Sequence, residues 1–135
     1  MTTMNVRLRS IADTQAALGW AGGHTVVVDR AEGKAGGMGL GFNGGELLGL
    51  AIGGCLCNDL HYVAAQTGIA IAAIEVDVAV SFEGQPLLAT RAEVRVKVTP
   101  VDPGADVETL IERARDDSTV SNSIQRGIEV EVMRA

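Results

Sequence analysis

Two cysteines on one predicted helix are the residues most able to do chemistry. Cys55 and Cys57 are the only cysteines among 135 residues. A cysteine becomes a nucleophile when a helix N-terminus or a cation stabilises its thiolate and a small substrate reaches it. Cys55 lies about two and a half turns inside a helix predicted over residues 46–67, where little of the helix dipole's effect remains. A reactive Cys55 therefore needs a cation from elsewhere, and the alternative is a small core residue, since free cysteine is often buried.

A second pair on the same helix is Cys57 and His61, four residues apart and so on one face. This spacing suits a His-activated thiol or half of a metal site, and Asp59 and His24 are further possible ligands. The cysteines match no zinc spacing, so we expect neither a metal nor another cofactor. The alternative for His61 is a helix-surface position near an interface. A disulfide between Cys55 and Cys57 is not expected, because residues i and i+2 point about 200° apart on a helix.

A glycine pattern precedes this helix. Gly39, Gly41 and Gly44 match the dinucleotide fingerprint, and backbone N–H groups at the start of a helix bind pyrophosphate. The fingerprint requires a strand that ends directly before it and a parallel strand after the helix. Here the nearest predicted strand ends near Asp29, and the later strands alternate as antiparallel ones do. We therefore expect residues 31–45 to form a flexible loop rather than a nucleotide site.

A serine-rich segment near the C-terminus contains Ser118, Ser121 and Ser123. A serine hydrolase of the common α/β type would need a Gly-x-Ser-x-Gly turn, and the chain has none. Ser118 is instead expected to cap a short helix.

The long helix has clear start and stop signals. Asn43 and Glu46 form a capping box, and Gly68 is placed to end the helix after residue 67. Its first half, LLGLAIGGC, is apolar on every side and is therefore expected to be buried all round. A sheet covers only one face of a helix, so a partner chain is the natural second cover.

Alternating apolar and polar residues predict antiparallel strands on both sides of the helix. The predicted elements are strands at 4–8 and 26–28 around a turn at 19–23, the helix at 46–67, a hairpin of strands at 76–82 and 92–98, helices at 106–116 and 118–125, and a last strand at 128–132. This order predicts an α+β fold in which antiparallel sheets pack on the long helix, in one domain over residues 1–135.

Charge and hydropathy exclude some classes of function. The net charge of -6 repels nucleic acid, and no cluster of Lys or Arg offsets it. The N-terminus lacks the features of a secretory signal, and the uncharged apolar run at residues 47–58 is too short to span a bilayer. We expect a soluble cytoplasmic protein with free thiols and no nucleic-acid or membrane partner.

Several motifs together resemble the OsmC/Ohr family, which comprises the osmotically inducible and organic hydroperoxide resistance proteins. The resemblance extends from about residue 24 to the C-terminus, and the motifs that carry it are GELLGLAIGGC (45–55), Gly68–Ile69 after the helix, the Val-rich hairpin, STVSN (118–122) and GIEV (127–130). It implies an intertwined α+β homodimer with the long helices buried centrally and two active sites at the dimer interface.

The resemblance also implies a role in the oxidative stress response, as a peroxidase that uses two cysteines. In similar family members the helix thiolate attacks the O–O bond of an organic hydroperoxide and becomes a sulfenic acid, which a second cysteine resolves as a disulfide. Cys55 matches the first position. The second position falls on Ser118, which cannot form a disulfide. The resemblance therefore implies an oxidoreductase that depends on an external thiol reductant.

Two further roles carry over less directly. The acid of the peroxidase members lies ten residues before the cysteine, which is Gly45 here, whereas Glu46 lies nine residues before it. Glu46 is therefore either the partner of an activating arginine or only a helix cap. Arg30 is the nearest candidate for that arginine, which stabilises the thiolate, and the alternative is a solvated charge after a strand.

The sequence leaves two hypotheses open. In the first, Cys55 reduces organic hydroperoxides or related electrophiles in a homodimer. In the second, the dimer has lost the chemistry and serves as an interaction module or binds a small apolar ligand. The serine at position 118 in place of a second cysteine and the displacement of the acid to Glu46 favour the second hypothesis. The presence of Cys55 at its expected place favours the first.

Overall fold

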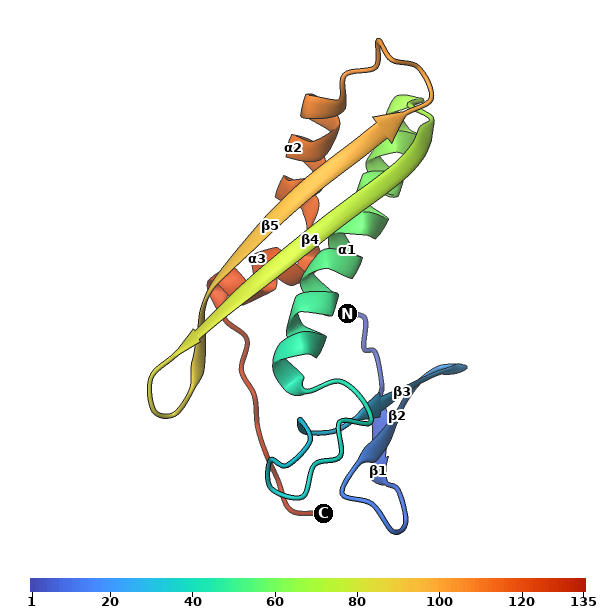
Figure 1. Ribbon diagram of the computed structural model, residues 1–135. Helices are drawn as coiled ribbons and strands as arrows, with labels where there is room; N and C mark the ends of the chain where they lie inside the picture. Colours follow the sequence, from blue (N-terminus) through green and yellow to red (C-terminus); the bar gives the residue numbers. More distant parts are fainter. The chain divides into compact units, whose positions relative to one another are not determined.

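The computed structural model describes all of residues 1–135, and its contacts divide the chain into two compact units (Figure 1). The first unit comprises residues 1–48 and the second residues 49–135. The boundary falls inside the long helix.

The first unit contains a three-stranded antiparallel sheet. Its strands are β1 (Arg7–Ser10), β2 (Ala17–Ala21) and β3 (His24–Val28), in the order β1-β2-β3. The predicted turn at 19–23 is wrong in part, because residues 19–21 belong to β2 and only Gly22–Gly23 turn. Glycine suits position 19 of this strand because there is little room for a side chain. A Cβ there would lie only 3.3 Å from a methyl of Val26 and 3.5 Å from Leu8. The glycine allows close cross-strand packing rather than a turn.

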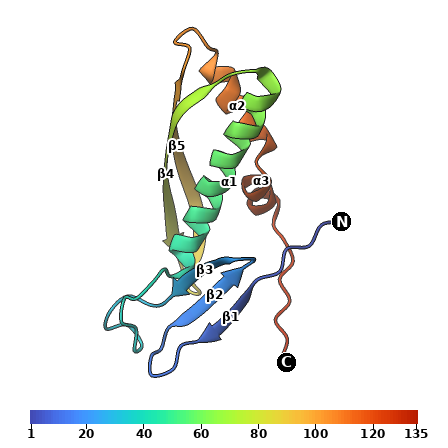
Figure 2. The same ribbon diagram turned by 90° about the vertical axis from the view of Figure 1, so that its right-hand side faces the viewer.

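The second unit contains a long helix, a long hairpin and two shorter helices. Helix α1 (Gly44–Thr67) begins in the first unit and is followed by β4 (Ile71–Glu83), β5 (Leu88–Pro100), α2 (Val107–Asp117) and α3 (Thr119–Arg126). β4 and β5 pair antiparallel over most of their length, as predicted. Figure 2 shows α1 and α2 on the same side of this hairpin. The predicted α+β class, antiparallel strands and long helix are therefore confirmed.

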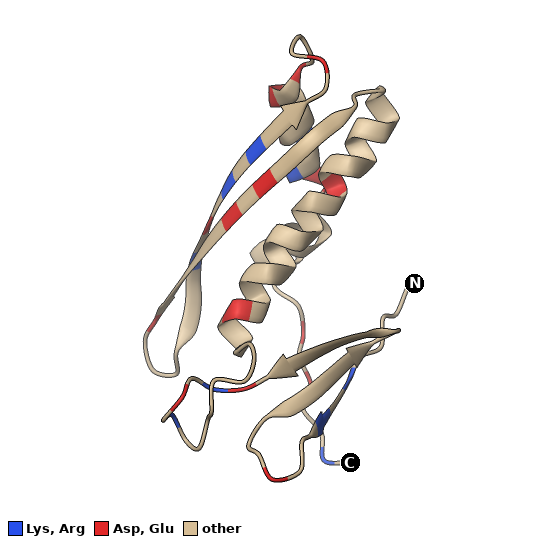
Figure 3. Cartoon of the chain, turned by 45° about the vertical axis from the view of Figure 1, so that its right-hand side comes forward, with Lys and Arg blue, Asp and Glu red and all other residues tan.

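The core of the second unit lies between α1, α2 and the hairpin. It consists of Leu56, Leu60, Val63 and Ala64 of α1, Val98 of β5, and Leu110 and Ala114 of α2. The charged side chains of the hairpin lie mainly on its opposite face, where Glu75 pairs with Lys97 at 3.6 Å across the strands. Figure 3 shows these acidic and basic positions along β4 and β5. The alternation along both strands thus separates a wet face from a face packed on α1.

Helix α1 begins and ends where its capping residues predict. The Glu46 amide donates to Asn43 Oδ1 at 2.9 Å, the Asn43 amide donates to Glu46 Oε1 at 3.4 Å, and Gly68 follows the helix with a φ of +72°. The expectation that its first half is buried all round does not hold within one chain. Leu50 is 55% exposed, because the hairpin and α2 contact only the other face of the helix. By length and composition alone α1 could also cross a membrane, a criterion that core helices of soluble proteins meet as well.

The predicted last strand is wrong for the single chain. Residues 128–135 form no strand, although Ile128, Val130 and Val132 alternate with charged residues as strand residues do. All three apolar side chains are strongly exposed. A strand needs a sheet edge to pair with, and this segment pairs with none here.

Candidate functional site

The candidate nucleophile, Cys55, is half-buried on α1. Its Sγ donates a hydrogen bond to Asp59 Oδ2 at 3.4 Å, one turn along the same helix. A carboxylate accepts the thiol proton but disfavours negative charge on the sulfur. Within the second unit the sulfur thus has an anionic hydrogen-bond partner, the opposite of the cation that an activated thiolate requires.

Cys57 and His61 lie one turn apart on α1, with Cys57 half-buried and His61 exposed. No hydrogen bond joins them, and no group of three or more His, Cys, Asp or Glu side chains in the chain could hold a metal ion. Both cysteines are free.

Ser118, which the resemblance matches to the second cysteine of the peroxidase members, lies between α2 and α3 and is only 1% exposed. Its carbonyl accepts from the Asn122 amide and from Asn122 Nδ2, so its backbone does begin α3. The predicted side-chain cap is wrong, because the hydroxyl makes no capping bond and Ser118 Oγ is buried with no hydrogen-bond partner. This position therefore holds a small, buried side chain whose hydroxyl forms no hydrogen bond with the helix.

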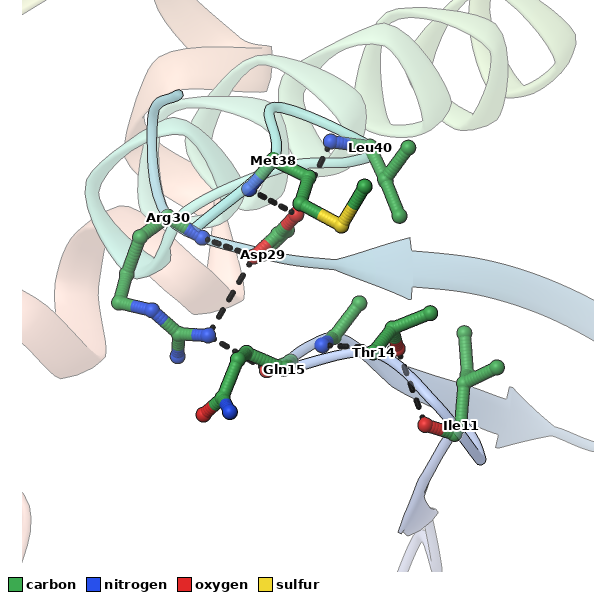
Figure 4. Close-up of polar contacts among 8 residues, drawn as sticks. Ile11, Thr14, Gln15, Asp29, Arg30, Met38 and Leu40 are labelled. Atoms are coloured by element: carbon green, nitrogen blue, oxygen red, sulfur yellow. Dashed lines mark hydrogen bonds and ion pairs between the residues drawn. The ribbon is translucent and has the colours of Figure 1, made fainter. Parts of the chain in front are cut away.

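The first unit contains a polar centre that the sequence analysis missed. Asp29 follows β3 directly and is buried, and its carboxylate accepts from the amides of Arg30 at 2.8 Å, Met38 at 3.0 Å and Leu40 at 3.1 Å. Figure 4 shows this carboxylate between Arg30 and the glycine-rich loop. Asp29 thus ties the loop to the end of the sheet. An acidic residue directly between a β-branched strand and a glycine-rich loop is the sequence feature that could have indicated it.

These hydrogen bonds also set the charge of Asp29. The Leu40 amide, the Met38 and Arg30 amides and the Arg30 guanidinium hold the pKa of the Asp29 carboxyl below its ordinary value, and burial opposes them in part. Asp29 is therefore a stable anion at neutral pH.

The same carboxylate explains why the glycine pattern is no nucleotide site. The Met38 and Leu40 amides donate to Asp29, and the Phe42 amide donates to the Val27 carbonyl at 2.9 Å. A phosphate would have to displace these partners. The strands after the helix are antiparallel, so the parallel strand that the fingerprint requires does not follow either.

Arg30, the candidate activating cation, is held by two groups of the first unit. Its guanidinium lies 3.4 Å from Asp29 Oδ1 and donates to the Gln15 carbonyl, as Figure 4 shows. The side chain remains 43% exposed, and its Nε is buried without a hydrogen-bond partner. Arg30 is thus positioned by specific contacts and is not the freely solvated charge of the alternative interpretation.

Glu46, the candidate acid, forms the capping box with Asn43 described above and makes no other side-chain hydrogen bond. Arg30 and Glu46 belong to the first unit, whereas Cys55, Asp59 and Ser118 belong to the second.

Taken together, an α+β fold with antiparallel strands and a half-buried cysteine on its long helix define the class of the protein. A family model described as OsmC-like protein matches residues 36–133. The chain therefore belongs to the OsmC family. No curated protein sequence matches it significantly.

Solved structures with this fold come from several bacteria. An OsmC-like protein of unknown function from Vibrio cholerae has a TM-score of 0.79 at 10% identity, over 91% of this chain and 94% of that one. An organic hydroperoxide resistance protein OsmC from Legionella pneumophila has a TM-score of 0.65 at 17% identity, with 93% and 90% covered. An organic hydroperoxide resistance protein from Elizabethkingia anophelis has a TM-score of 0.68 at 19% identity, with 96% and 92% covered. At these identities the likeness establishes the fold.

Proposed function

We propose that the protein reduces organic hydroperoxides or related electrophiles through the Cys55 thiol, with an external thiol as the reductant. The observation that carries the proposal is the half-buried state of Cys55 on an apolar helix of an OsmC fold. Such a sulfur is open to a small apolar substrate without being fully solvated. Membership of the OsmC family and the similar fold of two organic hydroperoxide resistance proteins support the peroxide-related role.

The proposed reaction has two stages. The Cys55 thiolate attacks the terminal, hydroxyl oxygen of the hydroperoxide, so that an S–O bond forms as the O–O bond breaks, and the alkoxide leaves as an alcohol after taking up a proton. The sulfur is oxidised by two electrons to a sulfenic acid. A first external thiol then forms a mixed disulfide and releases water, and a second external thiol frees Cys55 and leaves as a disulfide. This regeneration requires no second protein cysteine, which is necessary because Ser118 cannot form a disulfide.

Activation of the thiol requires a change in its surroundings. Asp59 Oδ2 accepts the hydrogen bond of the resting thiol, and its carboxylate opposes negative charge on the sulfur. A thiolate at Cys55 therefore needs a cation, and we assign this role to Arg30, whose side chain is 43% exposed. Glu46 acts as the helix cap in this proposal.

We further propose that the protein is a homodimer in the cytoplasm, where cellular thiols keep both cysteines reduced. Two features support a second copy of the chain as the partner. Leu50 on α1 is 55% exposed, in a fold whose buried apolar surface is small. The alternating segment at 128–132 is exposed and unpaired, as expected of a strand that joins the sheet of another copy.

A second candidate function is an OsmC-fold dimer that binds a small ligand and does no chemistry. The hydrogen bond from Cys55 to the Asp59 carboxylate favours it, because the carboxylate disfavours a thiolate. The buried Ser118 favours it as well, because an internal disulfide is impossible.

Consumption of cumene hydroperoxide in the presence of dithiothreitol separates the two candidates. We expect turnover by the wild-type protein and by Cys57→Ser, and a loss of at least about a hundredfold in Cys55→Ser, because the nucleophile itself is removed. Equal rates in wild type and Cys55→Ser would rule out the peroxidase. Circular dichroism of each variant establishes that it is folded.

A further inference from the structure

A groove on the sheet of the first unit carries positive charge that the proposed reaction does not use. It has a volume of about 460 Å³, within the roughly 300–1,000 Å³ of typical small-molecule sites. Its lining residues are Asn5, Val6, Arg7, Arg9, Trp20 and Gly22. The groove therefore combines two arginines, one indole and no acidic side chain.

The strand register explains why these side chains meet. Arg7 of β1 lies opposite Trp20 of β2, so both side chains emerge on one face of the sheet, about 5 Å apart at their Cβ atoms. Arg9 is two residues further along β1 and therefore emerges on the same face. The two guanidinium groups and the indole thus share one surface by backbone geometry.

Neither arginine is neutralised within the chain. None of the ion pairs involves Arg7 or Arg9, and the only side-chain hydrogen bond of the two goes from Arg9 to the Leu8 carbonyl, at 2.9 Å. The surplus of acidic residues lies in the second unit. The first unit carries equal numbers of basic and acidic residues, namely Arg7, Arg9, Arg30 and Lys34 against Asp13, Asp29, Glu32 and Glu46.

We infer that this groove binds a small organic anion with a flat apolar group. The carboxylate or phosphate of such a ligand accepts hydrogen bonds from the Arg7 and Arg9 guanidinium groups, which suit planar anions. Its ring lies against Trp20, and Val6 adds apolar surface. The inference rests on residues of the first unit alone and does not depend on the proposed peroxidase activity.

The chain offers a specific probe, because Trp20 is its only tryptophan. In ¹⁵N-labelled protein the indole N–H therefore gives a single cross-peak. Benzoate supplies both a carboxylate and a ring, benzyl alcohol supplies the ring without charge, and acetate supplies the charge without a ring. We expect benzoate to shift the Trp20 cross-peak saturably, and the other two probes to bind at least about fivefold more weakly, since each lacks one contact.

The arginines are tested by Arg7→Gln and Arg9→Gln, each expected to weaken benzoate binding about two- to fivefold. The double variant is expected to weaken it about tenfold, and higher salt should weaken binding to the wild type. Arg134→Gln removes one positive charge from the C-terminal segment and is expected to have no effect. Unsaturable shifts, equal binding of all three probes, or unchanged benzoate binding in the double variant would overturn the inference.

Discussion

At the scale of single residues, the best-defined polar centre is not a cysteine but Asp29. Its carboxylate accepts three backbone amides and lies beside Arg30 (Figure 4). Because its pKa is lowered in the folded chain, the folded state favours the ionised form more than the unfolded state does. Asp29 therefore stabilises the loop at any pH above its ordinary pKa of about 3.9, and this contribution is lost as the pH falls through the lowered value.

Asp29→Asn is expected to loosen the glycine-rich loop, because an amide side chain cannot replace both carboxylate oxygens as acceptors. Hydrogen exchange at the Met38 and Leu40 amides should become roughly tenfold faster at neutral pH. In the wild type, protection of these amides should decrease as the pH falls below about 4, and the variant should lack this dependence. Unchanged exchange in Asp29→Asn would contradict the assigned role.

The two cysteines provide an internal comparison of thiol reactivity. Both are half-buried on one helix, and of the two only Cys55 forms a hydrogen bond with Asp59. In Cys57→Ser, the additional change Asp59→Asn should speed iodoacetamide alkylation of Cys55 at pH 7 by about three- to tenfold, because one negative charge beside the sulfur is removed. An unchanged or slower rate would contradict the role assigned to Asp59, and Cys55→Ser provides the corresponding rate for Cys57.

At the scale of secondary structure, local patterns predicted the elements that depend on local chemistry. Asn43, Glu46 and Gly68 located the ends of α1, and the alternation in β4 and β5 located the hairpin. The sequence could not place Gly19 in a strand, because the reason for a glycine there is its contact with Val26 and Leu8 on neighbouring strands. Contacts of this kind are set by tertiary structure and leave no periodic pattern.

The candidate site was predictable in part for the same reason. Cys55 and Ser118 were found through a motif, whereas Asp29 and Asp59 act through hydrogen bonds that only the folded chain reveals. The strand expected at residues 128–132 has the right alternation, but pairing depends on an available sheet edge. A periodic pattern therefore predicts what a segment can form rather than what it pairs with.

Adjacent glycines on α1 test how closely the helix packs on the hairpin. A Cβ at Gly53 would lie 3.0 Å from Val78 Cγ2, whereas nothing lies within 4 Å of one at Gly54. Gly53→Leu should lower the free energy of unfolding by about 1–3 kcal/mol through overpacking. Gly54→Leu should leave the stability of the single chain unchanged or raise it by about 0.5–1 kcal/mol, because leucine favours helix. Urea unfolding of dilute protein measures both, and equal effects would contradict this packing.

At the scale of the whole molecule, the chain exposes more apolar surface than a lone soluble unit would be expected to leave. Leu50 of α1 and the segment at 128–132 are two examples in the second unit. A second copy that covers both would reconcile the apolar helix with its exposed face. The proposal of a dimer therefore rests on the burial of apolar side chains as well as on the proposed catalysis.

Leu50→Glu is expected to shift the protein from dimer to monomer, because a buried unpaired carboxylate at the interface is strongly unfavourable. The affinity should fall at least about a hundredfold, as measured by sedimentation velocity across a concentration series. Leu87→Glu is the matched control, since Leu87 is 67% exposed in the turn of the hairpin and should leave the dimer intact. A wild-type monomer at all concentrations would contradict the proposed assembly.

The central claim is that Cys55 is oxidised by an organic hydroperoxide, and single-turnover trapping tests it most directly. The reduced protein is mixed with one equivalent of cumene hydroperoxide and dimedone, and the modified residues are located by mass spectrometry. We predict one alcohol released per chain and a dimedone adduct on Cys55 and not on Cys57. Intact hydroperoxide with no adduct, or an adduct on Cys57 alone, would contradict the account.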